Sequence, residues 1–250
     1  MARVNRLALA LLGLVVFLAL WEAAPRLGLV NPALVPGPSS LPKAFVKELI
    51  SGNWGEAVVG SLGHYAVGLV VGIGLGAIFG ILTGMYRTIE ALTAGVIRVL
   101  RPVPGLAWVP FAIIWFGVSP AAAVFIIAVG VFWIVFFAAF GAVRSVDRDL
   151  IELAAAFGYR SGWARLVKVV LPAATPGILV GVRTALGQAW MSVVAAEIFG
   201  VAGLGQRMMQ ASSLLASDIV VVYMLTMAAL YGLVDIAFLG LSGWLTRWKA

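Results

Sequence analysis

The chain has 250 residues, of which 63% are hydrophobic and 11% charged, and its formal net charge is +7. Soluble domains carry roughly 25% charged residues, so this composition excludes an aqueous domain with one apolar core and favours the bilayer as solvent. No Cys and a single His exclude a disulfide framework and a multi-histidine metal site within one chain. The basic residues lie at the ends of apolar segments, which indicates membrane orientation rather than nucleic-acid binding.

Six apolar segments are long enough to cross a bilayer as helices. A helix is the only open structure that satisfies its own backbone groups in lipid, so we predict an all-α, polytopic membrane protein. With the N-terminus placed in the cytoplasm, inner segments hold ten Lys or Arg and outer segments four, which places both termini inside. The predicted spans cover residues 7–24, 57–85, 89–117, 121–143, 173–198 and 219–245.

The first apolar segment has two interpretations. Arg3 and Arg6 precede it, and the small residues Ala23 and Ala24 follow it, as in a cleaved signal peptide. The alternative is a retained first span, and we favour it because many more spans follow.

Two short helices are expected between spans, on the outer side. Residues 35–40 form a turn-rich stretch, after which Leu41, Phe45 and Leu49 recur at helical spacing up to Gly52. This pattern predicts an amphipathic helix lying on the outer face. A second short helix is expected within residues 203–217.

Glycine recurs at every fourth position of the second predicted span, with His64 taking one of the steps. Small residues on one helix face let a neighbouring backbone approach closely, so we expect a tight helix contact, either sliding or static. His64 is expected to be a hydrogen-bonded structural residue. The glycines are Gly60, Gly68, Gly72, Gly76, Gly80 and Gly84.

The third predicted span is interrupted by Pro102 and Pro104, with Arg98 and Arg101 beside the break. Prolines free backbone carbonyls and bend helices, and broken helices often lie near transporter sites. Arg101 is therefore a candidate for the substrate pathway. An anchor for lipid headgroups is the equal alternative.

The inner segment 144–172 predicts a short, slim helix. Asp147 and Asp149 precede it, Glu152 lies in its first turn, and Gly158 is suited to the left-handed stop that ends a helix. Residues 154–156 are all Ala, which keeps the helix narrow. Such a helix suits docking into a groove on a partner, and an ordinary surface helix is equally compatible with the composition.

This segment resembles the EAA loop of bacterial ABC-importer permeases that work with a periplasmic binding protein. Glu152, Ala154, Gly158 and Leu171-Pro172 match the family pattern, whereas Leu153 replaces its middle Ala and the spacing after Gly158 is one residue longer. In this family the helix docks on a cytoplasmic ATPase. The docking residues that the resemblance implies are Glu152, Ala154, Ala155, Gly158 and Arg160.

Further stretches are similar to the nitrate/sulfonate/taurine subgroup. They include residues 101–110 and 114–117, and residues 181–190 with 195–197 and 203–205 beyond. The resemblance covers about residues 30–245 and implies one transmembrane permease domain over 1–250. Its first part, 1–56, holds the first span and a periplasmic segment, and its core, 57–245, has the type I importer fold.

The resemblance also implies partners and a location. They are a second permease copy, two cytoplasmic ATPases that bind ATP and Mg, and a periplasmic binding protein, all at a bacterial inner membrane. The chain has no phosphate-binding loop of the G-x-x-x-x-G-K-[ST] type, since none of its lysines follows a Gly. We therefore expect a translocation subunit without a cofactor or enzymatic activity of its own.

Polar residues within the predicted spans are candidates for the pathway, because buried charges in lipid are costly. Arg183 lies about 15 Å from the inner end of its span and suits a bidentate contact to a sulfonate, nitrate or carboxylate. An ion pair with Asp235 or Glu197 is the alternative, and Asp235 with Tyr231 is expected to hydrogen-bond within the last span. The candidate pathway residues are Arg183, Gln188, Ser192, Arg101 and Glu197.

Two other classes of protein remain to be weighed. A stand-alone, ion-coupled carrier or channel would use Glu197, Asp218 or Asp235 as its coupling carboxylate. A membrane-embedded enzyme needs a nucleophile–base pair or a metal set, and one His with no Cys leaves little for either.

Overall fold

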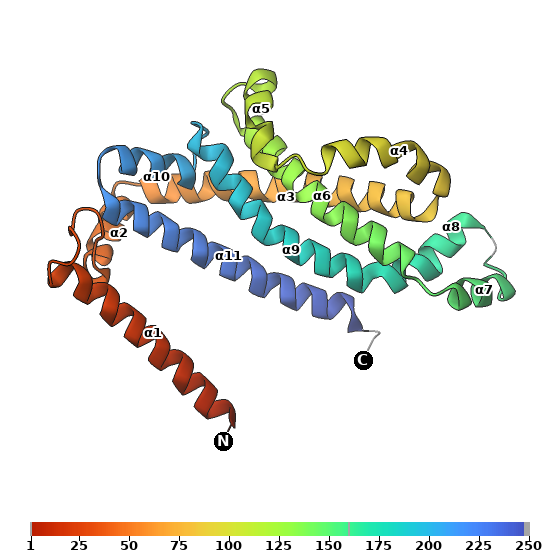
Figure 1. Ribbon diagram of the computed structural model, residues 1–250, viewed down its shortest axis with the longest axis horizontal. Helices are drawn as coiled ribbons and strands as arrows, with labels where there is room; N and C mark the ends of the chain where they lie inside the picture. The colour runs from red at the N-terminus through yellow and green to blue at the C-terminus, as the bar shows by residue number, and fades with distance from the viewer. Residues whose placement is uncertain (1, 160, 248–250) are drawn as a thin grey trace.

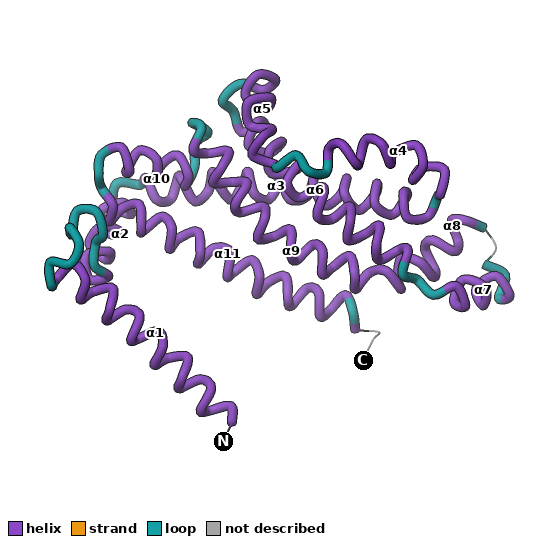
Figure 2. The backbone as a smooth tube through the Cα atoms, in the orientation of Figure 1, coloured by secondary structure: helices purple, strands orange, loops and turns teal. Residues whose placement is uncertain are grey.

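The computed structural model describes residues 2–159 and 161–247, and these residues form helices joined by loops (Figure 2). The prediction of an all-helical membrane protein is confirmed. Four long helices run side by side along the longest axis of the molecule (Figure 1). They are α3 (Asn53–Met85), α6 (Pro120–Arg144), α9 (Leu171–Ile198) and α11 (Ser217–Leu245).

The shorter helices lie around this bundle. At one end are α2 and α10, and at the other are α7 and α8 (Figure 1). The first helix, α1, runs apart from the bundle, and its Trp21 indole donates to the Pro36 carbonyl, in the loop that leads to α2, at 2.9 Å. Trp21 also packs on a cluster that contains Leu41 of α2 and Val222 of α11. The bounds are α1 Ala2–Arg26, α2 Leu41–Ile50, α4 Arg87–Leu100, α5 Val109–Phe116, α7 Arg148–Ala156, α8 Gly162–Arg165 and α10 Leu204–Ser213.

The described residues contain five helices long and apolar enough to cross a membrane, or six if a bent pair is counted as one span. The pair consists of Arg87–Leu100 and Gly105–Phe116, which meet at 88°. The break lies at Pro102 and Pro104, as predicted. Proline has no backbone N–H to donate, and its ring clashes with the carbonyl of the preceding helical turn. The bend is sharp enough that α5 projects away from the bundle (Figure 1).

The fifth predicted span begins earlier than expected. Helical structure starts at Gly162 and continues to Ile198, rather than beginning at residue 173. A π-helical turn, Leu166–Val170, comes directly before Pro172. The wider turn lets the helix continue past this proline instead of ending at it.

The packing of α3 on α6 depends on the glycines of α3. A methyl group built on Gly72 would lie 2.7 Å from the Val131 Cβ, and one on Gly80 would lie 2.5 Å from the Phe136 carbonyl oxygen. Because no real side chain tolerates such distances, glycine is what allows the two backbones to approach. Gly68, Gly76 and Gly84 face α6 in the same way.

An adjacent face of α6 packs as closely on α9. On α9, Gly177 and Gly181 face Ala142 and Ala138 of α6, and a methyl group on Gly177 would lie 2.8 Å from the Ala142 Cβ. Helix α6 therefore packs closely on the glycines of both α3 and α9. These three helices form the tightly packed core of the bundle, and α11 packs against α9.

The inward face of α2 differs from the expectation. Leu41 is buried as predicted, but Leu49 is exposed and Glu48 is buried in its place. The Glu48 carboxylate accepts hydrogen bonds from the Tyr223 hydroxyl at 2.6 Å and the Arg207 guanidinium at 3.1 Å. These partners stabilise a buried carboxylate that an apolar pattern cannot reveal.

Candidate functional site

A charged pair lies on the surface of the bundle, far from either end. Arg183 of α9 donates to both carboxylate oxygens of Asp235 in α11, each at 2.9 Å. The Arg183 side chain is 49% exposed and that of Asp235 20%. Of the alternatives drawn from the sequence, the ion pair with Asp235 is the one formed. The expected bond between Tyr231 and Asp235 is wrong, because the carboxylate turns toward α9.

A cavity of about 500 Å³ opens between α9 and α11, beside this pair. Thr184, Gln188 and Tyr231 are among its polar lining residues, and Ile134 of α6 is among its apolar ones. Tyr231 lies against α9 at Gly187, where a methyl group would make an ordinary contact, 3.6 Å from the Tyr231 hydroxyl oxygen. Polar groups of two helices therefore meet in one cavity at membrane depth.

Trp190 also lines this cavity, and it is 6% exposed. Its ring stacks on Tyr65 with centroids 4.7 Å apart, and the Tyr65 hydroxyl donates to the Leu186 carbonyl at 3.2 Å. Among the described residues the Trp190 indole nitrogen has no hydrogen-bond partner. The sequence indicated packing for Trp190, and the unpaired donor is a feature that the sequence did not reveal.

Gln188 and Ser192 do not share a site, although their spacing placed them on one helix face. Gln188 lines the α9–α11 cavity, whereas Ser192 is buried against α6. A methyl group on Gly130 would lie 2.7 Å from the Ser192 hydroxyl oxygen. Ser192 therefore fills the contact between α9 and α6, and it does not line the cavity.

Arg101 lies on the other side of α6 from Arg183. Its guanidinium is 4.6 Å from the ring centroid of Phe137, and with Arg98 and Glu90 it lines a cavity of about 270 Å³. Arg144 closes one side of this region by an ion pair with Glu90 at 2.6 Å. Within one chain, Arg101 and Arg183 therefore belong to separate sites.

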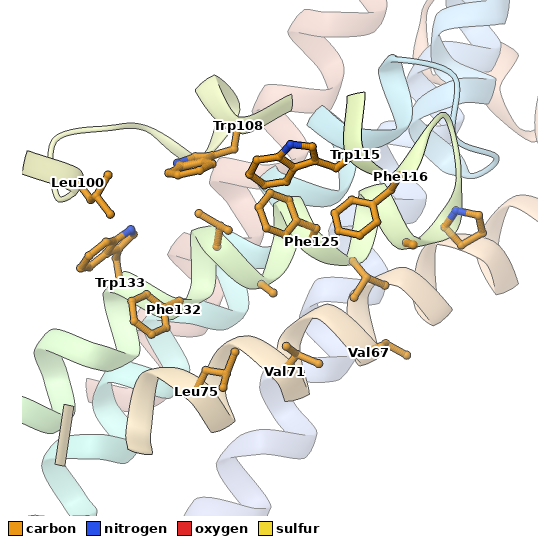
Figure 3. Close-up of a pocket in the computed structure, with 15 residues that line it drawn as sticks. Val67, Val71, Leu75, Leu100, Trp108, Trp115, Phe116, Phe125, Phe132 and Trp133 are labelled. Carbon is orange, nitrogen blue, oxygen red and sulfur yellow. The ribbon is translucent and has the colours of Figure 1, made fainter. Parts of the chain in front are cut away.

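A larger cavity, about 850 Å³, lies along α3 and α6 beneath the bent third span. Figure 3 shows Trp108, Trp115, Phe116 and Phe125 on one side of it, and Val67, Val71 and Leu75 of α3 on the other. Apart from the indoles of Trp108, Trp115 and Trp133, its lining side chains are apolar. Such a surface suits apolar groups and has little to offer an anion.

Glu197 is fully buried at the end of α9 nearest α10. Its carboxylate accepts from the Ser61 hydroxyl at 2.7 and 2.8 Å and from the Gly205 backbone N–H at 2.9 Å, and it lies 3.0 Å from the His64 ring nitrogen Nδ1. The Ser61 hydroxyl in turn accepts from the Leu204 N–H at 2.8 Å. This geometry ties α3, α9 and α10 together and gives His64 the structural role expected of it.

At the other end of the bundle, α7 projects with its docking candidates in different environments. The Asp147 carboxylate caps the helix by accepting from the Asp149 N–H at 3.0 Å, and Gly158 ends it with a φ of +92°. Ala154 is buried against the bundle, Ala155 is half-buried and Glu152 is exposed. Arg160 lies outside the described residues.

One face of α7 carries exposed apolar side chains beside a cavity of about 400 Å³ at the start of α9. Leu150, Leu153 and Phe157 recur at helical spacing and all three are exposed, Phe157 by 80%. Leu153, which departs from the family pattern, is thus part of a continuous apolar stripe. A contiguous exposed apolar surface is typical of contact sites for another protein or for a membrane.

Comparison with known proteins agrees with this arrangement. Residues 72–249 match the model of the family described as "Binding-protein-dependent transport system inner membrane component". The chain is 34% identical to the putative aliphatic sulfonates transport permease protein SsuC of Escherichia coli (strain K12), over 92% of this chain and 88% of that protein. It is 30% identical to the taurine transport system permease protein TauC of the same organism, over 94% and 87%.

The bicarbonate transport system permease protein CmpB of Synechococcus elongatus is also 30% identical, over 98% of this chain and 90% of that protein. Among solved structures, the inward-facing MetNI methionine ABC transporter is similar with a TM-score of 0.67 and 21% identity, over 80% of this chain and 99% of that chain. This structural match shows that the chain shares the fold of that transporter subunit.

Proposed function

Because the chain belongs to the family of binding-protein-dependent transport system inner membrane components, we propose that it forms half of the pathway of an ATP-driven importer of small oxyanions. The family implies an ATPase and a binding protein as partners. In this proposal a second copy completes the pathway, two ATPases bind α7 of each copy, and both termini face the cytoplasm.

The position of the Arg183–Asp235 pair supports a pathway along α9 and α11. Arg183 lies about 18 Å along α9 from Leu171, and Asp235 lies about 15 Å from the end of α11, at a rise of 1.5 Å per residue. Both therefore lie within an apolar layer about 30 Å thick. Charges exposed at that depth face a protein interior or water, since lipid contact is too costly. This face is consequently the side on which a second copy or an aqueous path lies.

The relatives support an oxyanion as substrate. Their names refer to aliphatic sulfonates, taurine and bicarbonate, which all present oxygen atoms carrying negative charge. An arginine fork and neutral hydrogen-bond donors are the groups that recognise such atoms. The stand-alone carrier is disfavoured, because the family works with an external ATPase and binding protein.

Helix α7 is the proposed contact with the ATPase. Buried Ala154 shares a face with Leu150 and Phe157, and these two residues line a cavity beside the start of α9. Leu150, Leu153 and Phe157 are all exposed. An apolar helix face of this kind docks into a groove, where burial of leucine and phenylalanine side chains supplies the affinity. The expected place of Glu152 in the first turn is wrong, because α7 begins at Arg148 and its first-turn carboxylate is Asp149. Exposed Glu152, in the second turn, is placed to add a charged contact at the rim.

Replacement of the apolar stripe tests this proposal. We expect Leu153→Asp and Phe157→Asp each to reduce co-purification of the ATPase by roughly tenfold or more, since each removes about 1.5–3 kcal/mol of burial. Leu214→Asp is the matched control, because Leu214 is 78% exposed at the opposite end of the bundle. Normal ATPase recovery and coupled uptake in both α7 variants would remove α7 from the docking interface.

A further inference from the structure

We propose that the face formed by α3, α4 and α6 binds one anionic glycerophospholipid. Its phosphate lies between Arg98 and Arg101, and its acyl chains fill the apolar cavity beside them. This site is separate from the proposed transport pathway, because the Arg183–Asp235 pair and its cavity lie between α9 and α11. In the proposed orientation of the chain, the lipid belongs to the inner leaflet.

The first argument is the charge of the cavity at Arg98 and Arg101. Both residues line this cavity of about 270 Å³ and both are exposed, so a ligand can reach them. Within the described residues neither arginine forms an ion pair. The carboxylate of the cavity, Glu90, is engaged by Arg144 at 2.6 Å. Three arginines and one glutamate leave a net charge of +2, which suits a phosphodiester.

The second argument is the depth of these charges in the membrane. The Arg101 guanidinium lies over the Phe137 ring, 4.6 Å from its centroid. Helix α6 ends at Arg144, so Phe137 lies about 10 Å from the helix end, at a rise of 1.5 Å per residue. The headgroup layer of a bilayer is roughly 5–7 Å thick on each side. The guanidinium therefore lies near the boundary between headgroups and hydrocarbon, where a long arginine side chain can keep its charge beside a phosphate.

The third argument is the apolar cavity that continues from the arginines. It has a volume of about 850 Å³, and Leu100, directly before Arg101, lies with Trp133 at one of its ends (Figure 3). On α6 the residues that line the two cavities run from Pro120 to Phe140, about 30 Å of helix. A phospholipid spans one leaflet, roughly 20–22 Å. The two cavities together are therefore long enough for its headgroup and its acyl chains.

Lipid is the occupant that fits both cavities at once. Val67, Val71 and Leu75 on one wall of the apolar cavity are exposed, and so is Trp115 on the other. Acyl chains are as apolar as these side chains and fill such a surface at membrane depth. A helix of a second copy laid in the cavity would leave the arginine charges at its end without a partner. A phospholipid supplies the hydrocarbon and the counter-charge in one molecule.

Titration of dioleoylphosphatidylglycerol into the purified full-length chain in nonionic detergent, followed by native mass spectrometry, tests the inference. Dioleoylphosphatidylcholine has the same acyl chains and a phosphate whose charge is cancelled by choline, and we expect it to bind roughly tenfold more weakly. Arg98→Gln and Arg101→Gln should each raise the Kd for phosphatidylglycerol roughly fivefold, and the double variant roughly 25-fold. Arg87→Gln is the matched control: it removes the same charge from an exposed position of α4 outside the cavity and should leave the Kd unchanged.

A second variant tests the acyl-chain part of the site. Val71 lines the apolar cavity and is 39% exposed, so Val71→Trp places a large ring in the cavity at a position that the fold leaves open. We expect the Kd of both lipids to rise roughly tenfold, which corresponds to the exclusion of about two CH₂ groups. Val70→Trp is the control, because Val70 is exposed on the same helix and does not line the cavity.

Four results would overturn the lipid site. Equal affinity of the wild type for the two lipids, or an unchanged Kd in the double arginine variant, would show that the arginines bind no headgroup. Complete displacement of phosphatidylglycerol by glycerol phosphate, with no effect of Val71→Trp, would identify a site for a soluble phosphate instead. A disulfide-linked dimer of Leu75→Cys, in a chain that has no other Cys, would place a second copy over the cavity. None of these measurements involves transport, so such a result leaves the proposed function untouched.

Discussion

The close contact between α3 and α6 gives a sharp prediction for Gly76→Ala. A methyl group at this position would lie 2.7 Å from the Phe132 carbonyl oxygen and 3.0 Å from the Val135 Cβ. Ordinary contact begins near 3.4 Å, so the two helices must separate by about 0.7 Å at this point. Gly74, two residues earlier on the same helix, has no atom within 4 Å of such a methyl group.

The expected loss of stability follows from the distance by which α3 and α6 must move apart. A gap of about 0.5–1 Å removes a quarter to a half of the dispersion energy of each atom pair across the interface. Summed over the neighbouring side chains, this agrees with the range of about 1–3 kcal/mol that overpacking costs in protein cores. Both alanine variants share the same gain in helix propensity, up to about 1 kcal/mol, so their difference isolates the contact.

Thermal unfolding of the purified permease in detergent measures this difference. We expect Gly76→Ala to unfold at a lower temperature than Gly74→Ala, by about 2–4 °C for each kcal/mol of contact energy lost. A Gly76→Ala variant as stable as Gly74→Ala would refute the reasoning, because it would show that α6 can move away from α3 without loss.

Two further predictions concern the end of the bundle near α10. Burial raises the pKa of Glu48, but hydrogen bonds from Tyr223 and Arg207 outweigh it and hold the pKa below the usual 4.5. A lowered folded-state pKa stabilises the fold above the unfolded value and loses that contribution as the pH falls through the folded value. The melting temperature should therefore drop below about pH 4.5, and Glu48→Gln should reduce the drop; an unchanged pH profile would contradict this. Ser61→Ala should cost about 1–3 kcal/mol, because it leaves the buried Glu197 carboxylate without one donor, and hydrogen exchange in α10 should accelerate. Exchange at the wild-type rate would show that this network does not anchor α10.

The sequence predicts most of the helical framework because the relevant signals are local. Apolar length defines the spans, and glycine at every fourth position of α3 places one helix face against a neighbour. Pro102 and Pro104 define the break in the third span. Each of these signals depends on residues that are close together in the sequence, so it can be read without knowing the tertiary structure. The helical stretch from Gly162 that runs into α9 is not predictable in this way, because a π-helical turn at Leu166–Val170 lets the helix pass Pro172.

The candidate sites are less predictable because their partners are distant in the chain. Arg183 had two possible carboxylate partners, and only the placement of α11 against α9 selects Asp235. Glu48 becomes buried through groups 159 and 175 residues away. For Trp190, nothing in the sequence distinguishes a packed indole from one with an unpaired N–H beside a cavity. The apolar stripe of α7 is the exception, since its spacing is local.

The central claim is that this chain translocates a small oxyanion only when a separate ATPase drives it. The most direct measurement is uptake of radiolabelled ethanesulfonate into proteoliposomes that contain the permease, with its ATPase and binding protein added or withheld. The account predicts uptake only with all three proteins and ATP. Uptake by the permease alone, driven by an ion gradient, would contradict it.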